Sequence, residues 1–250
     1  MKKNDFIFSR FSEKLGQIAI LIDPEKTQDH QRMVDLIKKA DFAGVDYFFV
    51  GGSTVTPEQM ERTIAVIKGH SETPVVIFPG DHQQVSERAD GLLYLSLLSG
   101  RNPEYLIGQH VTSAKRVYNL QSLEIIPTAY ILVDGGTSSS VAYVSQTTPI
   151  PRDKTTIAVN TALAGILQGK RLVYFDAGSG AKQSVPCEML KELRKNDKRT
   201  PIIVGGGIRS VEQLAEFKNA GVNVTVVGNH IEENIDFLLE VNAYTKKTDQ

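Results

Sequence analysis

Residues 173–181 read VYFDAGSGA, an apolar run that meets a carboxylate at Asp176 and then breaks into Gly-Ser-Gly. Continuous apolar runs of this kind are typical of strands buried on both faces, as in a parallel sheet covered by helices. In α/β barrels, the residues that bind ligands follow directly after such strands. The stretch therefore predicts a buried parallel strand that carries polar groups to a glycine-rich loop at one end of a sheet.

The same design recurs along the chain. Most strand-like runs end in glycine or aspartate, and segments of helical period follow them, such as the apolar residues at positions 33, 36, 37 and 40. Eight such units in 250 residues favour a single (β/α)8 barrel domain over residues 1–250, although the strand count alone leaves a doubly wound sheet open. The eight runs are 17–23, 46–52, 74–80, 91–97, 124–136, 171–178, 201–207 and 224–229.

Two segments depart from the regular repeat. Between the third and fourth strands only residues 80–91, GDHQQVSERADG, are available, which is barely enough for a crossover that contains a full helix. We therefore expect a modified (β/α)8 TIM barrel with a short or irregular third crossover. Residues 134–154 form a long polar insertion, and we interpret its VAYV core at 141–144 as an extra strand or a hairpin arm.

Charge and apolar content exclude several classes of protein. With 28 basic and 29 acidic residues the net charge is -1, so no overall basic field is available to hold nucleic acid or an anionic bilayer. No stretch reaches the roughly 18 apolar residues of a transmembrane helix, and the opening residues lack the apolar core of a secretory signal. Cys187 is the only cysteine, which fits a reducing compartment. We expect a cytoplasmic protein.

Three glycine-containing loops follow the last three predicted strands: 178–180, 205–207 and 228–229. Glycine allows a backbone to approach a ligand closely, and the N–H groups that open the next helix favour an anion. Many barrels bind phosphate after strands seven and eight. The loops therefore predict a phosphate site, while the alternative is that each glycine only permits a turn.

Carboxylates end the first and sixth predicted strands. Asp23, in LIDPEKT, could hold Mg²⁺ together with a hydroxyl of Ser53 or Thr54, because Mg²⁺ takes few protein oxygens beside phosphate and water. The alternative is that Asp23 only starts a turn. Asp176 is the candidate general base, with Tyr174 beside it on the same strand face. Their alternatives are a loop cap and a core residue.

Eight motifs taken together resemble the geranylgeranylglyceryl phosphate synthase family, which includes heptaprenylglyceryl phosphate synthases. The resemblance spans nearly the whole chain in order, and its two most specific parts are IPT…YI to PIP and the YxxAGSGA loop. The motifs are DPEKT at 23–27, VGGST at 50–54, PVVIFPG at 74–80, LLYLSLLSGRNPEYLIGQHV at 92–111, EIIPTAYILVDGGTSSSVAYVSQTTPIP at 124–151, YFDAGSGA at 174–181, VGGGIRS at 204–210 and VVGN at 226–229.

The resemblance implies a barrel whose third helix is missing or replaced. It also implies transfer of a polyprenyl group from a diphosphate to the 3-hydroxyl of sn-glycerol 1-phosphate, with release of diphosphate and help from Mg²⁺. It assigns Asp23 and Ser53 to the metal, and Tyr174 and Asp176 to catalysis. For glycerol phosphate it assigns Tyr174, Phe175, Asp176, Ala177, Gly178, Ser179, Gly180, Gly205, Gly206, Gly228 and Asn229. It further implies a homo-oligomer, and the lipidic donor is compatible with transient membrane contact.

This chain departs from the family pattern at two places. Family members commonly have glutamate where this chain has Asp176, and residues 79–85, PGDHQQV, differ from the PGS-type sequence of relatives. The prenyl tail needs an apolar groove, to which GLLYLSLL at 91–98 could contribute instead of forming ordinary core. Two other functions stay open: a phosphate-binding barrel isomerase or lyase, and a protein that only binds a phosphorylated isoprenoid.

Overall fold

A computed structural model describes residues 5–27 and 29–248, so both ends of the predicted domain, 1–4 and 249–250, lie outside the described residues. Its sheet is a closed barrel of eight parallel strands in sequence order, with the last strand paired to the first. This confirms the (β/α)8 barrel. The strands are β1 Gln17–Ile22, β2 Tyr47–Val50, β3 Val75–Ile77, β4 Gly91–Leu97, β5 Glu124–Leu132, β6 Leu172–Asp176, β7 Ile202–Gly205 and β8 Val224–Val227.

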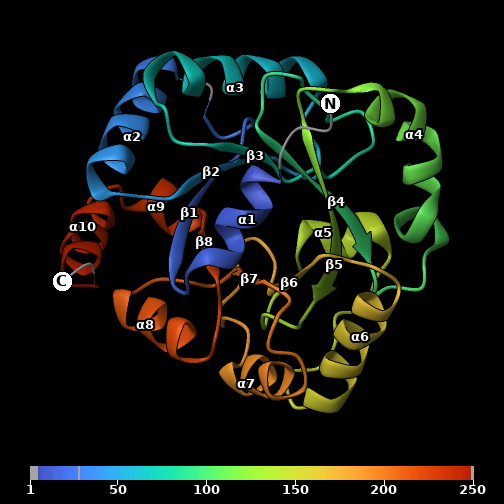
Figure 1. The fold of residues 1–250 in the computed structure, drawn as a ribbon. Helices are drawn as coiled ribbons and strands as arrows, with labels where there is room; N and C mark the ends of the chain where they lie inside the picture. The colour runs from blue at the N-terminus through green and yellow to red at the C-terminus, as the bar shows by residue number, and fades with distance from the viewer. Residues whose placement is uncertain (1–4, 28, 249–250) are drawn as a thin grey trace.

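Helices surround the barrel as an outer ring (Figure 1). Several begin where the sequence places a cap, as at Thr56 and Ser210, which each form a capping box with the glutamine three residues on. The helices are α2 His30–Ala43, α3 Pro57–His70, a π-helical turn η1 Glu104–Gly108, α4 Gln109–Asn119, α5 Ser140–Ser145, α6 Thr155–Leu167, α7 Cys187–Asn196, α8 Val211–Asn219, α9 Asn229–Glu233 and α10 Phe237–Thr248. In the described part of the chain, each helix is too short or too polar to cross a membrane.

A helix that the sequence did not predict closes the amino-terminal end of the barrel. This helix, α1 Phe6–Glu13, lies in the middle of the ring in Figure 1 and buries Ile7 and Phe11 in the barrel interior. The buried Glu124 carboxylate at the start of β5 accepts hydrogen bonds from the backbone N–H groups of Ile7 (2.7 Å) and Phe8 (3.0 Å). Glu124 thereby satisfies the free donors of the first turn, and the open end of the barrel faces away from α1.

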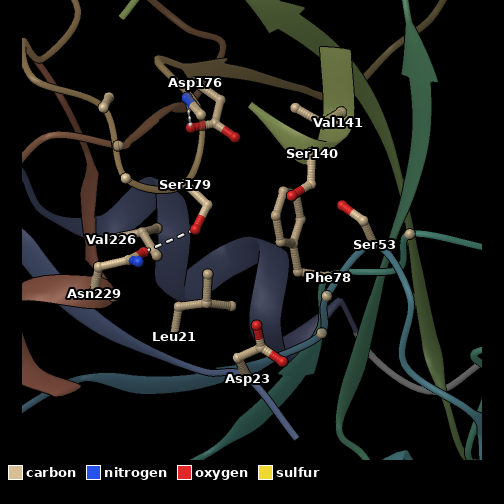
Figure 2. A pocket seen from close by; sticks show the side chains of 18 of the residues that line it. Leu21, Asp23, Ser53, Phe78, Ser140, Val141, Asp176, Ser179, Val226 and Asn229 are labelled. Atoms are coloured by element: carbon tan, nitrogen blue, oxygen red, sulfur yellow. Dashed lines mark hydrogen bonds between the residues drawn. The ribbon is translucent and has the colours of Figure 1, made fainter. Parts of the chain in front are cut away.

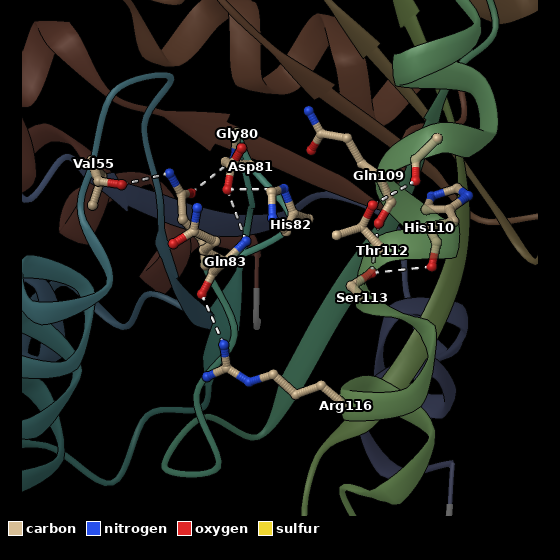
Figure 3. A network of polar contacts seen from close by, with 12 residues as sticks. Val55, Gly80, Asp81, His82, Gln83, Gln109, His110, Thr112, Ser113 and Arg116 are labelled. Carbon is tan, nitrogen blue, oxygen red and sulfur yellow. Dashed lines mark hydrogen bonds and ion pairs between the residues drawn. The ribbon is translucent and has the colours of Figure 1, made fainter.

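The third crossover has no helix between β3 and β4, as the sequence predicted. An irregular segment, 78–90, replaces it and is fastened to α4 (Figure 3). The Arg116 guanidinium of α4 donates hydrogen bonds to the backbone carbonyls of Gln83 (3.4 Å) and Val85 (2.7 Å). Hydrogen bonds from a side chain to the backbone therefore hold this segment against α4, in place of the packing that a helix would provide.

Gln84 anchors this segment to the loop after β2. Its side chain is 1% exposed; its amide nitrogen donates to the carbonyls of Gly52 (3.0 Å) and Val55 (2.9 Å), and its oxygen accepts from the Gly80 N–H (2.8 Å). Replacing Gln84 by alanine removes the partner of three backbone groups, one in a buried and two in partly buried hydrogen bonds. We expect the free energy of unfolding in urea to fall by about 3 kcal/mol. Alanine at the exposed Gln83 is the matched control, and a loss at position 84 no larger than the control would contradict this account.

Two sequence expectations were wrong. The VAYV core of the insertion lies in α5, because the Ser139 hydroxyl accepts a hydrogen bond from the Ala142 N–H and caps a helix there, and Gln146 ends it with φ of 53°. Only an isolated bridge, Val133 to Ile150, extends the sheet at this insertion. The spacing of Ile231, Ile235 and Leu238 predicts one last helix, whereas the structure divides this segment into α9 and α10.

Candidate active site

The open, carboxyl-terminal end of the barrel contains a cavity of about 310 Å³. It is lined by the loops after β1, β2, β3, β6, β7 and β8 and by the first residues of α5. Figure 2 shows Asp176 and Ser179 on one side of this cavity and Asp23 on the opposite side, with the Phe78 ring between them. The cavity therefore has two ends that carry different side chains.

Glycines of the last three loops form the first end. Gly178 and Gly206 have φ of 89° and 85°, in the left-handed region that only glycine adopts readily. A side chain on Gly206 would meet three atoms at 2.9 Å, namely the N–H nitrogens of Ala177 and Gly178 and a carboxylate oxygen of Asp176. The Ser179 hydroxyl donates to the Asn229 side-chain oxygen (2.9 Å), which joins the loop after β6 to α9. This end offers backbone N–H groups and the Ser179 and Asn229 side chains beside Asp176.

Asp176 ends β6 and is 7% exposed. One carboxylate oxygen accepts a hydrogen bond from the Tyr130 hydroxyl (2.6 Å) and the other accepts from the Gly178 N–H (2.8 Å). Burial raises the pKa of Asp176 above the ordinary aspartate value, although the two hydrogen bonds act in the opposite direction. Each oxygen keeps a second lone pair, so the group can still accept a proton.

Three aromatic rings line the cavity beside Asp176. The Tyr174 ring stacks on Phe78 with centroids 5.0 Å apart, and Tyr130 meets both rings edge-on at 5.6 and 5.7 Å. Burial raises the pKa of Tyr174 and Tyr130 well above the ordinary tyrosine value, so both stay protonated at neutral pH. The rings give the middle of the cavity an apolar wall.

Asp23 and Ser53 lie at the other end. One Asp23 oxygen accepts from the Glu25 N–H (3.0 Å), so Asp23 does start a turn, while its second oxygen is 3.8 Å from the Lys26 ammonium. Burial raises the pKa of Asp23, with hydrogen bonding and Lys26 opposing the shift. Gly52, which precedes Ser53, has little room for a side chain because its Cβ would lie 2.8 Å from the Val55 side chain and 3.0 Å from the Asp23 carboxylate. The described residues contain no cluster of three or more His, Cys, Asp or Glu that could hold a metal by themselves.

A second, smaller cavity of about 80 Å³ adjoins the first where the third helix is missing. Tyr130, Leu95 and Val141 line both cavities. Leu92, Tyr94 and Leu97 of β4 also line the second cavity, together with Tyr105 of η1. The GLLYLSLL run therefore contributes to an apolar groove as well as to the core.

Comparison with known proteins identifies the family. The model of the PcrB family matches residues 12–246. The chain belongs to the PcrB family. It is 47% identical to the geranylgeranylglyceryl phosphate synthase of Zunongwangia profunda, over 90% of this chain and 93% of that protein, and 41% identical to the one of Korarchaeum cryptofilum, over 90% and 91%.

A solved structure of a geranylgeranylglyceryl phosphate synthase has the same fold as this PcrB-family chain. The (S)-3-O-geranylgeranylglyceryl phosphate synthase of Thermoplasma acidophilum, crystallised with sn-glycerol-1-phosphate, superposes with a TM-score of 0.87 at 31% identity and covers 98% of each chain. The thiamine phosphate pyrophosphorylase of Pyrococcus furiosus superposes with a TM-score of 0.57 at 12% identity, which shows the barrel fold alone. The likeness to the pyrophosphorylase is therefore one of fold, whereas the likeness to the geranylgeranylglyceryl phosphate synthases extends to the sequence.

Most of the predicted site residues of this PcrB-family chain meet in the first cavity. The Phe175 side chain does not, because neighbouring residues of a strand face opposite sides and Phe175 packs outward among the helices while Tyr174 faces inward. Ala177 also packs outward, and Gly205 lies behind the Tyr174 hydroxyl, which a Cβ at position 205 would approach to 2.5 Å. The predicted residues that do line the cavity are Asp23, Ser53, Tyr174, Asp176, Gly178, Ser179, Gly180, Gly206, Gly228 and Asn229.

Sequence reasoning missed four residues that shape the site: Phe78, Tyr130, Lys26 and Glu232. Tyr130 lies opposite Tyr174 in the β5–β6 register, so its hydroxyl reaches Asp176 two residues farther along β6. Phe78 and Tyr130 each fall within a quoted motif, near the end of the run 74–80 and in the middle of the run 124–136, and those motifs were the available signal. Lys26 and Glu232 meet only through barrel closure.

Proposed function

We propose that this protein is a geranylgeranylglyceryl phosphate synthase. It would join the 3-hydroxyl of sn-glycerol 1-phosphate to the first carbon of a polyprenyl diphosphate, most simply geranylgeranyl diphosphate, and release diphosphate. The observation that carries the proposal is the single cavity with a buried carboxylate beside a glycine-lined phosphate end, aromatic rings in the middle and an oxygen-bearing end at Asp23 and Ser53. The names of the relatives at 41–47% identity support the same reaction.

Each end of the cavity has a defined task in this reaction. The phosphate of glycerol phosphate binds at the loops after β6, β7 and β8, where N–H groups and the Ser179 and Asn229 side chains lie. The glycerol hydroxyl then reaches Asp176, which takes its proton while the oxygen bonds to the prenyl carbon and the carbon–oxygen bond to diphosphate breaks. Tyr130 acts as a positioning residue that holds the carboxylate in place.

The aromatic wall suits the positive charge that develops during this reaction. An allylic carbon that loses diphosphate becomes cationic, and the faces of aromatic rings attract cations. Phe78 and Tyr174 line the cavity between the two ends, and neither carries a charge of its own. The prenyl tail would leave this wall through the second cavity along β4 and η1.

Asp23 and Ser53 fit a Mg²⁺ ion that takes most of its ligands from substrate and water. One carboxylate and one hydroxyl are a small donor set, which is what Mg²⁺ uses in sites where phosphates complete the shell. A Mg²⁺ ion held by these two residues would supply positive charge opposite the departing diphosphate. The assignment of these two residues, the prenyl chain length, a homo-oligomer and a cytoplasmic location with transient membrane contact stay predictions from the resemblance.

A turnover assay tests the proposal. Labelled sn-glycerol 1-phosphate, Mg²⁺ and a series of polyprenyl diphosphates are incubated with the protein, and organic-soluble product is counted. We expect product that requires the metal and the sn-1 isomer and that prefers one chain length. Absence of product with every donor, although glycerol phosphate binds, would favour a protein that only binds an isoprenoid phosphate.

The raised pKa of Asp176 predicts how activity depends on pH. The base must be deprotonated, so kcat/KM falls as the pH drops through the pKa of Asp176. Because burial raises that pKa, the fall should begin at a higher pH than for an ordinary aspartate. In Tyr130→Phe the carboxylate loses a hydrogen bond that favours its charged form, so the fall should move to a still higher pH. Identical profiles for the two proteins would contradict this role of Tyr130.

A further inference from the structure

Lys26 lies between two carboxylates in the cavity wall. Its ammonium is 2.9 Å from a Glu232 oxygen and 3.8 Å from an Asp23 oxygen. The Asp23 and Glu232 side chains are only 19% and 17% exposed, whereas Lys26 is 40% exposed. One exposed cation thus faces two partly buried acids.

Backbone contacts fix the segments that carry the two acids, while the Lys26 side chain is the most exposed of the three. The N–H groups of Lys26 and Thr27 both donate to the Asp23 carbonyl (3.0 and 3.2 Å), which folds the loop back so that Lys26 overhangs Asp23. Glu232 lies on α9, whose backbone is tied to α2 by a hydrogen bond from the Arg32 guanidinium to the Glu232 carbonyl (2.9 Å). Only the exposed end of Lys26 can change partner without disturbing these backbone contacts.

A bound diphosphate would need a cation near Asp23, and few basic side chains line the cavity there. A prenyl diphosphate brings several negative charges to a wall whose ionised acids lie mainly near Asp23. The basic side chains among the described lining residues are Lys26, Arg209 and, when protonated, His230. Arg209 follows the glycines after β7, at the phosphate end, so Lys26 is the permanent cation beside Asp23. The acidic lining residues are Asp23, Glu25, Asp176, Glu232 and Glu233.

We propose that Lys26 is a positioning residue with two alternating partners. In the empty site its ammonium neutralises Asp23 and Glu232. When a divalent cation binds Asp23, Lys26 is released to the diphosphate of the prenyl donor. The inference rests on the proposed function, because it requires a diphosphate substrate. It follows that Lys26 competes with the metal for Asp23 but cooperates with it in binding diphosphate.

Replacing Lys26 by methionine tests both parts of the proposal, because it should strengthen metal binding and weaken diphosphate binding. Titration of the free variant with Mn²⁺, followed by electron paramagnetic resonance, should show roughly threefold tighter binding, because an exposed ion pair no longer competes. Calorimetric titration with inorganic diphosphate in the presence of Mg²⁺ should show binding weakened by about tenfold or more, because a charge-assisted hydrogen bond is lost. Lys26→Arg should restore tight diphosphate binding.

Lys39→Met is the matched control, since Lys39 forms an exposed pair with Asp236 (3.5 Å) away from the cavity lining. It should leave both titrations unchanged. A purely structural role of Lys26 would weaken both ligands together and lower the thermal midpoint, and either that result or two unchanged titrations would overturn the inference. Failure of the proposed function appears separately, as absence of prenyl transfer by the unaltered protein.

Discussion

Replacing Asp176 by asparagine is expected to lower kcat by about 10²- to 10⁴-fold, the usual contribution of a general base. Asparagine keeps the size of the side chain: its amide oxygen can accept from the Gly178 N–H, and its amide nitrogen can donate to the Tyr130 hydroxyl oxygen, so the loop should keep its shape. It cannot take the proton of the glycerol hydroxyl. Single-turnover measurement of ether formation would report the effect.

The control for Asp176→Asn is affinity for glycerol phosphate without a donor. If the carboxylate acts as the base, sn-glycerol 1-phosphate should bind the variant within a few-fold of the unaltered protein, while turnover is lost. If Asp176 only caps the loop, affinity should fall along with turnover, because the N–H groups of residues 178–180 would lose their arrangement. Full activity of the variant would falsify the proposed role outright.

Replacing Gly206 by alanine should abolish measurable binding of glycerol phosphate. A residue with a side chain at φ of 85° is strained by about 1–2 kcal/mol, and its Cβ would lie 2.9 Å from the nitrogens of Ala177 and Gly178. The loops after β6 and β7 must then separate, which moves the N–H groups that would bind phosphate. We expect an affinity loss of at least about 100-fold, since several hydrogen bonds to one anion fail together.

Gly169→Ala separates strain from steric conflict in that experiment. Gly169 has nearly the same φ, 86°, but its Cβ would meet nothing within 4 Å, and it lies before β6 at the other end of the strand. This control should lose stability of a similar small size and keep its affinity for glycerol phosphate. Calorimetric titration of both variants with glycerol phosphate distinguishes the two effects. Equal affinities of the two variants would show that the Gly206 backbone does not shape the phosphate end.

Local pattern was enough to predict the barrel and the face that carries the site. Buried parallel strands read as short apolar runs, and the carboxyl ends of all eight strands meet at one end of a barrel, so Asp23, Asp176 and the glycine loops had to converge there. The missing third helix was likewise predictable, because too few residues were available between β3 and β4. Strand alternation also indicated that Tyr174 faces inward.

Contacts between distant segments were decided only by the tertiary structure. Tyr130 meets Asp176 across 46 positions, and Lys26 meets Glu232 across 206, because strand register and barrel closure bring their backbones together. The apolar VAYV segment fits a strand by composition, yet the Ser139 cap makes it a helix at the cavity. Sequence periodicity reports which face of an element is buried, whereas the partner on that face depends on how all the elements pack.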